Sequence, residues 1–273
     1  MPELPEVETI RRQLDEALPG RTLEHATIVD ERLTRPVPPA TVASELCGRR
    51  LGRVRRRGKF LRLGLDGGDE LVLHLRMTGR VHLEPGDSVE RTHVRAVLSI
   101  AAGDTVVISD QRRFATLRLA GPAETDAEWN ARLGVEPLEP GFTAARLQAL
   151  LDGRTTSIKA ALLDQRLVAG IGNIYADEAL FAAGVDPRRP AGGLTDRENR
   201  GLHRAIRDRL RAGIRTNGAS IDSFHDSLGN PGTMQHELRV HLREGQACPR
   251  CRTPVTKLRV AQRGTYVCER CQR

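Results

Sequence analysis

The sequence predicts an α+β protein of several modules: a helix and a β-sandwich or barrel, then a helical region, then a short metal-binding hairpin. Three observations indicate this class. Short alternating segments fill residues 61–120, apolar residues at helical spacing follow residue 143, and four of the five cysteines lie in the last 26 residues, 248–273. We expect a β domain over 1–134, a helical domain over 135–235 and a terminal module over 236–273.

The first helix follows from the opening MPELPEVE and the residues after it. Apolar residues recur at spacings of three, four and seven, at Val7, Ile10, Leu14, Ala17 and Leu18. A proline suits the first helical turn, and carboxylates there are favoured by the helix dipole. Pro19 and Gly20 end the pattern, so we expect a helix over Pro5–Leu18. Pro2 and Glu3 precede this helix, which leaves them without a structural explanation.

Residues 20–120 carry the β pattern. Six short alternating segments are separated by Gly/Asp turns such as 66–69 and 101–104; they read LRLGL, ELVLHL, RVHLE, HVRAVLSI, TVVIS and TLRLA. The Pro- and Gly-rich stretch GVEPLEPGF, 134–142, then reads as a linker. Beyond it, helical spacing predominates in ARLQALL, SIKAALLDQRL, IYADEALFAAG and DRENRGLHRAIRDRLRAGI.

Basic residues are concentrated in two segments. The chain has 43 Lys and Arg against 35 Asp and Glu, a net charge of +8. Residues 49–62 hold eight basic residues and no acid, and residues 241–273 hold eight basic residues and two glutamates. Two separate patches favour a long phosphate backbone as partner, with both contacting phosphate; a merely solvated Arg-rich face is the alternative. An aromatic content of 3% argues against a single-strand binder that stacks bases.

The chain lacks the sequence features of a secreted or membrane-spanning protein. No apolar run approaches the roughly 18 residues of a membrane span. The acidic, proline-rich start is unlike a secretory signal, and the clustered cysteines do not resemble a disulfide framework. We therefore expect a reducing, cytoplasmic location. Cys47, far from the other four cysteines, is expected to be a small buried residue.

The terminal cysteines form two C-x-x-C pairs separated by sixteen residues: Cys248 with Cys251, and Cys268 with Cys271. Each pair can place two thiolates on one tetrahedral ion, and the intervening length suits a β-hairpin. Four thiolates favour zinc and leave no open coordination position, so the metal is expected to be structural. An iron–sulfur site and a redox-active pair are the alternatives.

Five motifs in order give the sequence a family resemblance: MPELPEVET, RRGKF (56–60), DQRRF (110–114), LLDQRLVAGIGNIYADEALF (162–181) and AQRGTYVCERCQ (261–272). Together they resemble the bacterial formamidopyrimidine-DNA glycosylases, which remove 8-oxoguanine and ring-opened purines. The resemblance covers nearly the whole chain. It implies an N-terminal β-sandwich, a helix–two-turns–helix element over 157–185 and a C-terminal zinc-finger hairpin with one Zn2+. The partner would be duplex DNA with damaged bases, bound by a monomer in the cytoplasm and on the nucleoid.

The resemblance also implies catalytic residues. Pro2, exposed once the initiator Met is removed, would be the nucleophile that forms a Schiff base with the sugar. The resulting iminium drives β,δ-elimination, the AP lyase step. Glu3 would supply the proton that opens the sugar ring. Lys59 would contact phosphate near the damaged base, and Arg263 would hold phosphates at the flipped nucleotide.

Further DNA-binding residues follow from the same resemblance. Met77, Arg113 and Phe114 would fill the void left by the extruded base. His74, Lys159 and Asn173 would contact phosphates, with Asn173 at a helix N-cap. The loop 216–233 would cover 8-oxoguanine. Three residues depart from the common family pattern and bear on the geometry of the void-filling loops: Arg76, Gln111 and Ala115.

Two other functions remain open on the sequence. The sister endonuclease VIII group, which prefers oxidised pyrimidines, shares Pro2, Glu3, Lys59 and the zinc hairpin, although MPELPEVE and the Arg-Arg-Phe triplet favour the purine enzyme. A non-catalytic zinc-ribbon DNA-binding protein could also retain this fold.

Overall fold

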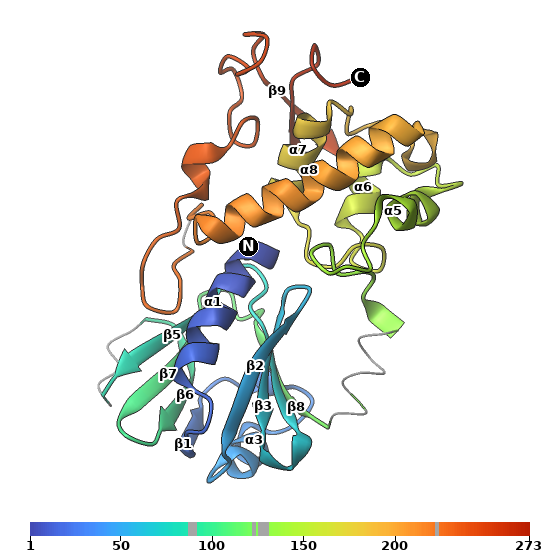
Figure 1. Ribbon diagram of the computed structural model, residues 1–273. Helices are drawn as coiled ribbons and strands as arrows, with labels where there is room; N and C mark the ends of the chain where they lie inside the picture. The colour runs from blue at the N-terminus through green and yellow to red at the C-terminus, as the bar shows by residue number, and fades with distance from the viewer. Residues whose placement is uncertain (87–91, 122–123, 125–130, 222–223) are drawn as a thin grey trace. The chain divides into compact units, whose positions relative to one another are not determined.

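The computed structural model describes residues 1–86, 92–121, 124, 131–221 and 224–273 (Figure 1). The chain divides into two compact units. The first comprises Met1–Ala131 and Thr216–Thr233, and the second comprises Arg132–Arg215 and Met234–Arg273. The loop 216–233 thus belongs with the N-terminal unit, although it follows the helical region in sequence. The division into three domains over 1–134, 135–235 and 236–273 stays a prediction from the sequence.

Two four-stranded antiparallel sheets, ordered β1-β6-β7-β5 and β2-β3-β4-β8, build the first unit (Figure 1). The predicted sandwich is confirmed. Alternating burial along β3, where Leu61, Leu63 and Leu65 are buried, shows that this strand supplies one face to the core, whereas β4 is buried along its whole length. The strands are β1 Leu23–Ile28, β2 Leu51–Arg57, β3 Phe60–Leu65, β4 Glu70–His74, β5 Gly79–Pro85, β6 Val94–Ile100, β7 Asp104–Asp110 and β8 Thr116–Ala120.

The first helix, α1, spans Leu4–Ala17 and confirms the predicted range within one residue at each end. Its apolar face, Val7, Ile10 and Leu14, is at most 1% exposed and belongs to the core of the sandwich. The remaining helical elements of this unit are short: α2 Glu31–Thr34, α3 Pro39–Leu46 and the 3-10 turn η1 Asp66–Gly68. Cys47, expected to be buried, is exposed because it directly follows the end of α3.

The second unit is helical and ends in a hairpin. Its long helix α8 buries Leu202, Ile206 and Leu210 and packs on α7 and α5, as its amphipathic sequence predicts. The elements are α5 Ala144–Leu151, α6 Ile158–Leu163, α7 Asn173–Ala183, η2 Ala191–Gly193, α8 Asp196–Arg215, η3 Met234–Glu237, β9 Thr256–Val260 and β10 Arg263–Val267.

The turns between α6 and α7 are held by one side chain. Gln165 accepts a hydrogen bond from the Gly170 amide at 2.8 Å and donates to the Ile171 carbonyl at 2.8 Å. Gly170 takes a φ of 90°, which a residue with a side chain rarely adopts. These bonds set the point at which α7 begins.

The stretch 134–142 was expected to be a linker, and this was wrong. The Gly134 amide donates to the Gln165 carbonyl at 2.8 Å, and Val135 forms a bridge with Val168. Phe142 is 2% exposed, with its ring 5.0 Å from that of His203. Although its Pro and Gly residues prevent a helix, the segment is a packed part of the second unit.

In the part of the chain that the structure describes, no helix has both the length and the apolarity to cross a membrane.

Candidate active site

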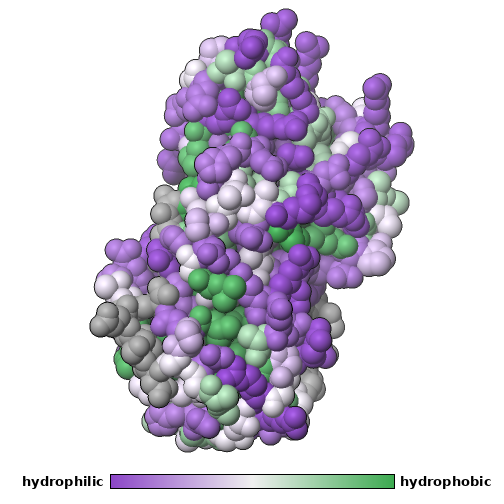
Figure 2. Space-filling model, turned by 60° about the vertical axis from the view of Figure 1, so that its left-hand side comes forward, coloured by the Kyte–Doolittle hydropathy of each residue, from purple (hydrophilic) through white to green (hydrophobic). Residues whose placement is uncertain are grey.

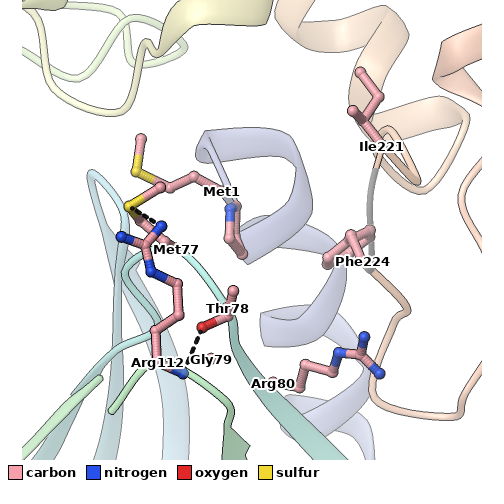
Figure 3. A pocket seen from close by; sticks show the side chains of 9 residues that line it. Met1, Met77, Thr78, Gly79, Arg80, Arg112, Ile221 and Phe224 are labelled. Atoms are coloured by element: carbon pink, nitrogen blue, oxygen red, sulfur yellow. Dashed lines mark hydrogen bonds between the residues drawn. The ribbon is translucent and has the colours of Figure 1, made fainter. Parts of the chain in front are cut away.

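A cavity of about 110 Å³ lies at the N-terminus of the first unit (Figure 3). Pro2 lines it and is itself buried. Met1 lines it as well, and residues of three other segments complete the lining: Met77, Thr78, Gly79 and Arg80 from the β4–β5 turn and β5, Arg112 after β7, and Ile221 and Phe224 from the loop 216–233. The fold therefore brings the expected nucleophile, one expected void-filling residue and the expected lesion-covering loop to a single cavity.

Glu3 and Glu6 hold the start of α1, and Glu6 also binds the loop 216–233. Glu3 caps α1 in a reciprocal arrangement in which its own amide donates to Glu6 Oε2 at 2.9 Å. The other oxygen of Glu6 accepts from the Ala219 amide at 2.8 Å, so Glu6 also holds the loop 216–233. Both carboxylates are 2% exposed. The dipole of α1 explained Glu6 from sequence alone, and its contact with the loop was missed because 213 residues separate the partners.

The loop is anchored a second time near its end. Asp226 Oδ2 accepts from Gln13 Nε2 at 2.8 Å, and Gln13 Oε1 accepts from the Ser227 amide at 2.9 Å. The Ser227 carbonyl accepts from the Leu83 amide of β5 at 2.7 Å. The segment lining the cavity is thus held from both sides, by α1 through Glu6 and by α1 with β5 through Ser227.

Lys59 lies in the turn between β2 and β3, directly before Phe60, and His74 is the last residue of β4. Phe60 pairs with His74 in the sheet, and their rings meet edge to face with centroids 4.3 Å apart. Burial, helped by the charges of Arg76 and Lys59, lowers the pKa of His74 to about 3, so its ring is neutral at pH 7. Its Nδ1 accepts the Arg76 amide at 3.0 Å, which leaves Nε2 as the nitrogen that carries hydrogen.

Two turns of the first unit hold apolar side chains out to solvent. Met77 is 40% exposed and Phe114 48% exposed, whereas most of the surface in Figure 2 is hydrophilic. Arg112 lies between them, with Nη1 3.1 Å from Met77 Sδ and its guanidinium 4.7 Å from the centre of the Phe114 ring. Figure 3 shows Arg112 reaching toward Met77. These three side chains form one group, which we call the wedge.

Arg113, which the resemblance placed in this group, points elsewhere. Its Nε and Nη2 donate to the two carboxylate oxygens of Asp30 at 2.6 and 2.7 Å. Asp30 is 3% exposed, and Arg113 holds its pKa down at about 2. The structure therefore places Arg112, not Arg113, beside Met77 and Phe114. The Arg-Arg-Phe triplet alone does not distinguish the two arginines.

The four terminal cysteines form a metal site. Their sulfur atoms all lie within 4.8 Å of one another, with Cys248 and Cys271 at 3.9 Å and Cys251 and Cys268 at 3.4 Å. Zn–S bonds of about 2.3 Å in a tetrahedron require sulfur atoms about 3.8 Å apart. The donor set and spacing fit one structural zinc. Cys248 and Cys268 also pack with Phe181 and Val240, so the metal site is part of a small core.

Lys159 is fully buried in the second unit, where it joins α6, α7 and the hairpin. Its ammonium lies 2.7 Å from Asp177 Oδ1 and donates to Thr265 Oγ1 at 2.7 Å and to the Gly264 carbonyl at 3.1 Å. The phosphate contact implied for Lys159 does not fit this position, because no face of the ammonium reaches solvent. Lys159 instead fixes the hairpin beside Arg263.

Arg263 and Asn173 flank that buried lysine. Arg263 is exposed and begins β10, directly after a two-residue turn in which Ala261 and Gln262 have φ of 50° and 61°. Asn173 is the first residue of α7 and Gly172 is the N-cap, one residue from the expected assignment. The Asn173 Nδ2 donates to the Gly264 carbonyl at 3.0 Å, which places Asn173 at the hairpin tip.

Comparisons with known proteins cover the whole chain. Residues 1–117 match the formamidopyrimidine-DNA glycosylase N-terminal domain, 133–225 its H2TH domain, and 245–273 the zinc finger found in FPG and IleRS. A formamidopyrimidine-DNA glycosylase of Symbiobacterium thermophilum is 45% identical over 273 residues, covering 100% of this chain and 89% of that protein. The chain belongs to the formamidopyrimidine-DNA glycosylase family.

Solved structures support this membership. A point mutant of the Lactococcus lactis enzyme in complex with Fapy-dG-containing DNA superposes with a TM-score of 0.94 at 33% identity, over 100% of both chains. The Lactococcus lactis enzyme with abasic-site DNA gives 0.93 at 33% identity over 99% of both. As a member of the family, this chain is a base-excision DNA glycosylase for oxidised bases, and AP lyase activity is typical of the group.

Proposed function

We propose that this glycosylase removes oxidised purines, 8-oxoguanine and formamidopyrimidines, from duplex DNA and cleaves the strand through a Schiff base on Pro2. It would act as a monomer in the cytoplasm, on the nucleoid. The observation that carries the proposal is the cavity of the first unit, whose lining includes Pro2, Met77, Arg112, and Ile221 and Phe224 of the loop 216–233.

The chemistry requires a free Pro2 nitrogen. With Met1 attached, that nitrogen is an amide and cannot attack, so the active form lacks Met1. The freed secondary amine attacks C1′ of the everted sugar with its lone pair, and the base leaves with the electrons of the glycosidic bond and takes up the proton that the proline nitrogen loses. Glu3 protonates the ring oxygen as the sugar opens. The product is an iminium cation, which has no N–H to lose.

The iminium acts as the electron sink for strand cleavage. It acidifies the C2′ proton, and loss of that proton expels the 3′ phosphate. A second elimination expels the 5′ phosphate. We assign Lys59 and His74 to phosphate contacts beside the sugar, with neutral His74 donating from Nε2. Asn173 and Arg263 are assigned to flanking phosphates, where the exposed guanidinium of Arg263 is suited to bidentate contact.

For the void left by the extruded base, we propose the wedge of Met77, Arg112 and Phe114. Met77 and Phe114 offer exposed apolar surface that replaces lost stacking. Arg112 offers a guanidinium that can hydrogen-bond the orphaned base. Arg113, predicted for this role from the sequence, is replaced by Arg112 because Asp30 holds the Nε and Nη2 edge of the Arg113 guanidinium.

Two assays test the proposal. Borohydride should trap a covalent adduct on 8-oxoguanine:C duplex, and Pro2→Gly should reduce the trapping; absence of any adduct would indicate a non-catalytic binding protein. Cleavage of 8-oxoguanine:C should exceed cleavage of thymine glycol:A. The reverse preference would place the chain with the pyrimidine-specific group.

A further inference from the structure

Arg112 and Arg113 are adjacent in sequence, but their side chains contact different parts of the first unit. Arg112 contacts Met77 and Phe114 in the wedge. Arg113 turns back and pairs with Asp30, which lies 83 residues earlier in the chain. Either guanidinium could in principle reach a base opposite the lesion, so something must determine which one does.

Asp30 is built to hold an arginine. It is the N-cap of α2, where Oδ1 accepts the Arg32 amide at 3.0 Å. Both oxygens also receive the Arg113 guanidinium, in the bidentate geometry that makes such pairs strong. Arg95 adds a second cation 3.5 Å from Oδ2. This carboxylate is nearly inaccessible to solvent and holds one edge of the Arg113 guanidinium, so the Arg113 side chain, although 41% exposed, is tied to Asp30 and not to the wedge.

The backbone of the same turn is fixed by a different carboxylate. Asp110, 1% exposed, accepts the amides of Phe114 and Ala115 on Oδ2, each at 2.7 Å. Its Oδ1 accepts the Arg112 amide at 3.1 Å and the Thr78 hydroxyl, which ties this turn to the one that carries Met77. Because Asp110 sets the backbone, the contact of Asp30 acts mainly on the Arg113 side chain.

We propose that Asp30 is a positioning residue for opposite-base specificity: by sequestering Arg113 it leaves Arg112 as the single guanidinium facing the orphaned base. The inference rests on the proposed function of the wedge. Cytosine presents two acceptors, O2 and N3, on its pairing edge, whereas adenine presents one acceptor beside an amino donor. One guanidinium at a fixed place favours cytosine. A second, mobile one would find acceptors on other bases and weaken that preference.

The test compares excision of 8-oxoguanine opposite C and opposite A, as the ratio of the two kcat/KM values, in four proteins. These are the wild type, Arg112→Gln, Asp30→Asn, and the double variant Asp30→Asn with Arg113→Gln. Asparagine also caps helices, so Asp30→Asn should retain the start of α2. We expect Asp30→Asn to lower the C:A ratio about tenfold, the range of one bidentate base contact.

The double variant separates a specificity role from a structural one. It removes the competing guanidinium together with its partner, and replacing both members of a hydrogen-bonded pair costs less than replacing one, because no buried group is left unpaired. We expect its C:A ratio to return to within about twofold of the wild type, with borohydride trapping on an abasic duplex similar in all the Asp30 variants. A merely structural role for Asp30 predicts that the double variant is no better than Asp30→Asn.

Each outcome has one meaning. If Arg112→Gln leaves the ratio unchanged, the wedge assignment in the proposed function fails. If Arg112→Gln lowers the ratio but Asp30→Asn does not, or the double variant does not recover, the inference about Asp30 is overturned and the wedge assignment stands. Asp30→Ser, which also retains a capping side chain, provides the same comparison if Asp30→Asn does not fold.

Discussion

The two basic segments, 49–62 and 241–273, look alike in sequence and differ in the structure. In the first, five arginines pair with carboxylates: Arg49 with Asp66 and Asp69, Arg53 with Asp15, Arg55 and Arg62 with Glu70, and Arg56 with Glu8. These ion pairs join β2 and β3 to α1, to β4 and to the β3–β4 turn. Much of this charge is therefore neutralised within the first unit.

The second segment, 241–273, leaves several of its arginines exposed to solvent. Arg252, Arg259, Arg263 and Arg270 are exposed and make no ion pair with any residue that the structure describes. The zinc site and the buried Lys159 hold the hairpin that carries them. The comparison teaches that the fold decides which cations of a basic segment stay available to an anionic partner. That both segments contact phosphate stays a prediction.

The largest effect is expected from removing the zinc. Cys251→Ser leaves three thiolates, and structural zinc in small modules contributes about 10–16 kcal/mol of folding free energy. The hairpin should unfold and tight duplex binding should be lost, while the first unit retains its sheets. Zinc content and gel-shift affinity measure this. Chelator-treated protein that still bound duplex tightly would contradict a structural role for the metal.

Removal of the Lys159 ammonium comes next. Lys159→Met leaves Asp177 as a buried carboxylate without its lysine, at a cost of about 3–5 kcal/mol. Thermal unfolding should show a destabilised second unit. The matched variant Arg53→Met, which removes an exposed guanidinium from Asp15 and leaves Arg11 on that carboxylate, should cost less than about 1 kcal/mol. Equal losses would mean that the two regions do not differ as described.

A third prediction concerns pH and the first unit. His74 has a pKa of about 3 in the folded protein and about 6.5 when unfolded, so between these values the unfolded chain binds the additional proton. Stability should therefore decline as pH falls from 6.5 towards 3. Urea unfolding at pH 7 and pH 5 measures the decline, which should be shallower in His74→Gln. An identical decline in both proteins would rule out His74 as its source.

The smallest expected effect is on the salt dependence of DNA binding, and it distinguishes the two basic segments most directly. Each phosphate contact contributes about 0.9 to the slope of log affinity against log salt. Replacing Arg259 and Arg263 with glutamine should reduce that slope by about 2 if both contact phosphate. Replacing Arg53 and Arg55, which pair with Asp15 and Glu70, should leave it unchanged. The opposite pattern would assign the phosphate contacts to the strand segment.

Much of the fold could be predicted from local sequence patterns. The apolar face of α1, the positions of six strands and the spacing of the four cysteines each depend on neighbours within one element, and each is confirmed. Strand β2 was missed because its buried residues, Leu51 and Val54, lie three apart across a shift in register, so the segment does not alternate. Its burial depends on carboxylates from α1 and β4, which a local pattern does not show.

The site was predictable only where a motif specifies the residue itself. The place of Pro2 and Glu3 before α1 left them without a structural explanation, and only the family motif gave them catalytic roles, which stay a prediction. The sequence could not show that Lys159 is enclosed by Asp177 and Thr265, or that Arg113 is removed from the wedge by Asp30. These outcomes depend on contacts across 18, 106 and 83 residues, because long-range packing decides whether a cation faces solvent or a buried carboxylate.

The most direct test of the account is to locate the covalent bond. Borohydride-reduced adducts on 8-oxoguanine:C duplex can be digested with protease and nuclease and mapped by mass spectrometry. We predict the sugar remnant on the nitrogen of Pro2, in chains that lack Met1. A remnant on Lys59, or full strand cleavage by protein that retains Met1, would contradict the central claim that the N-terminal imine drives the chemistry.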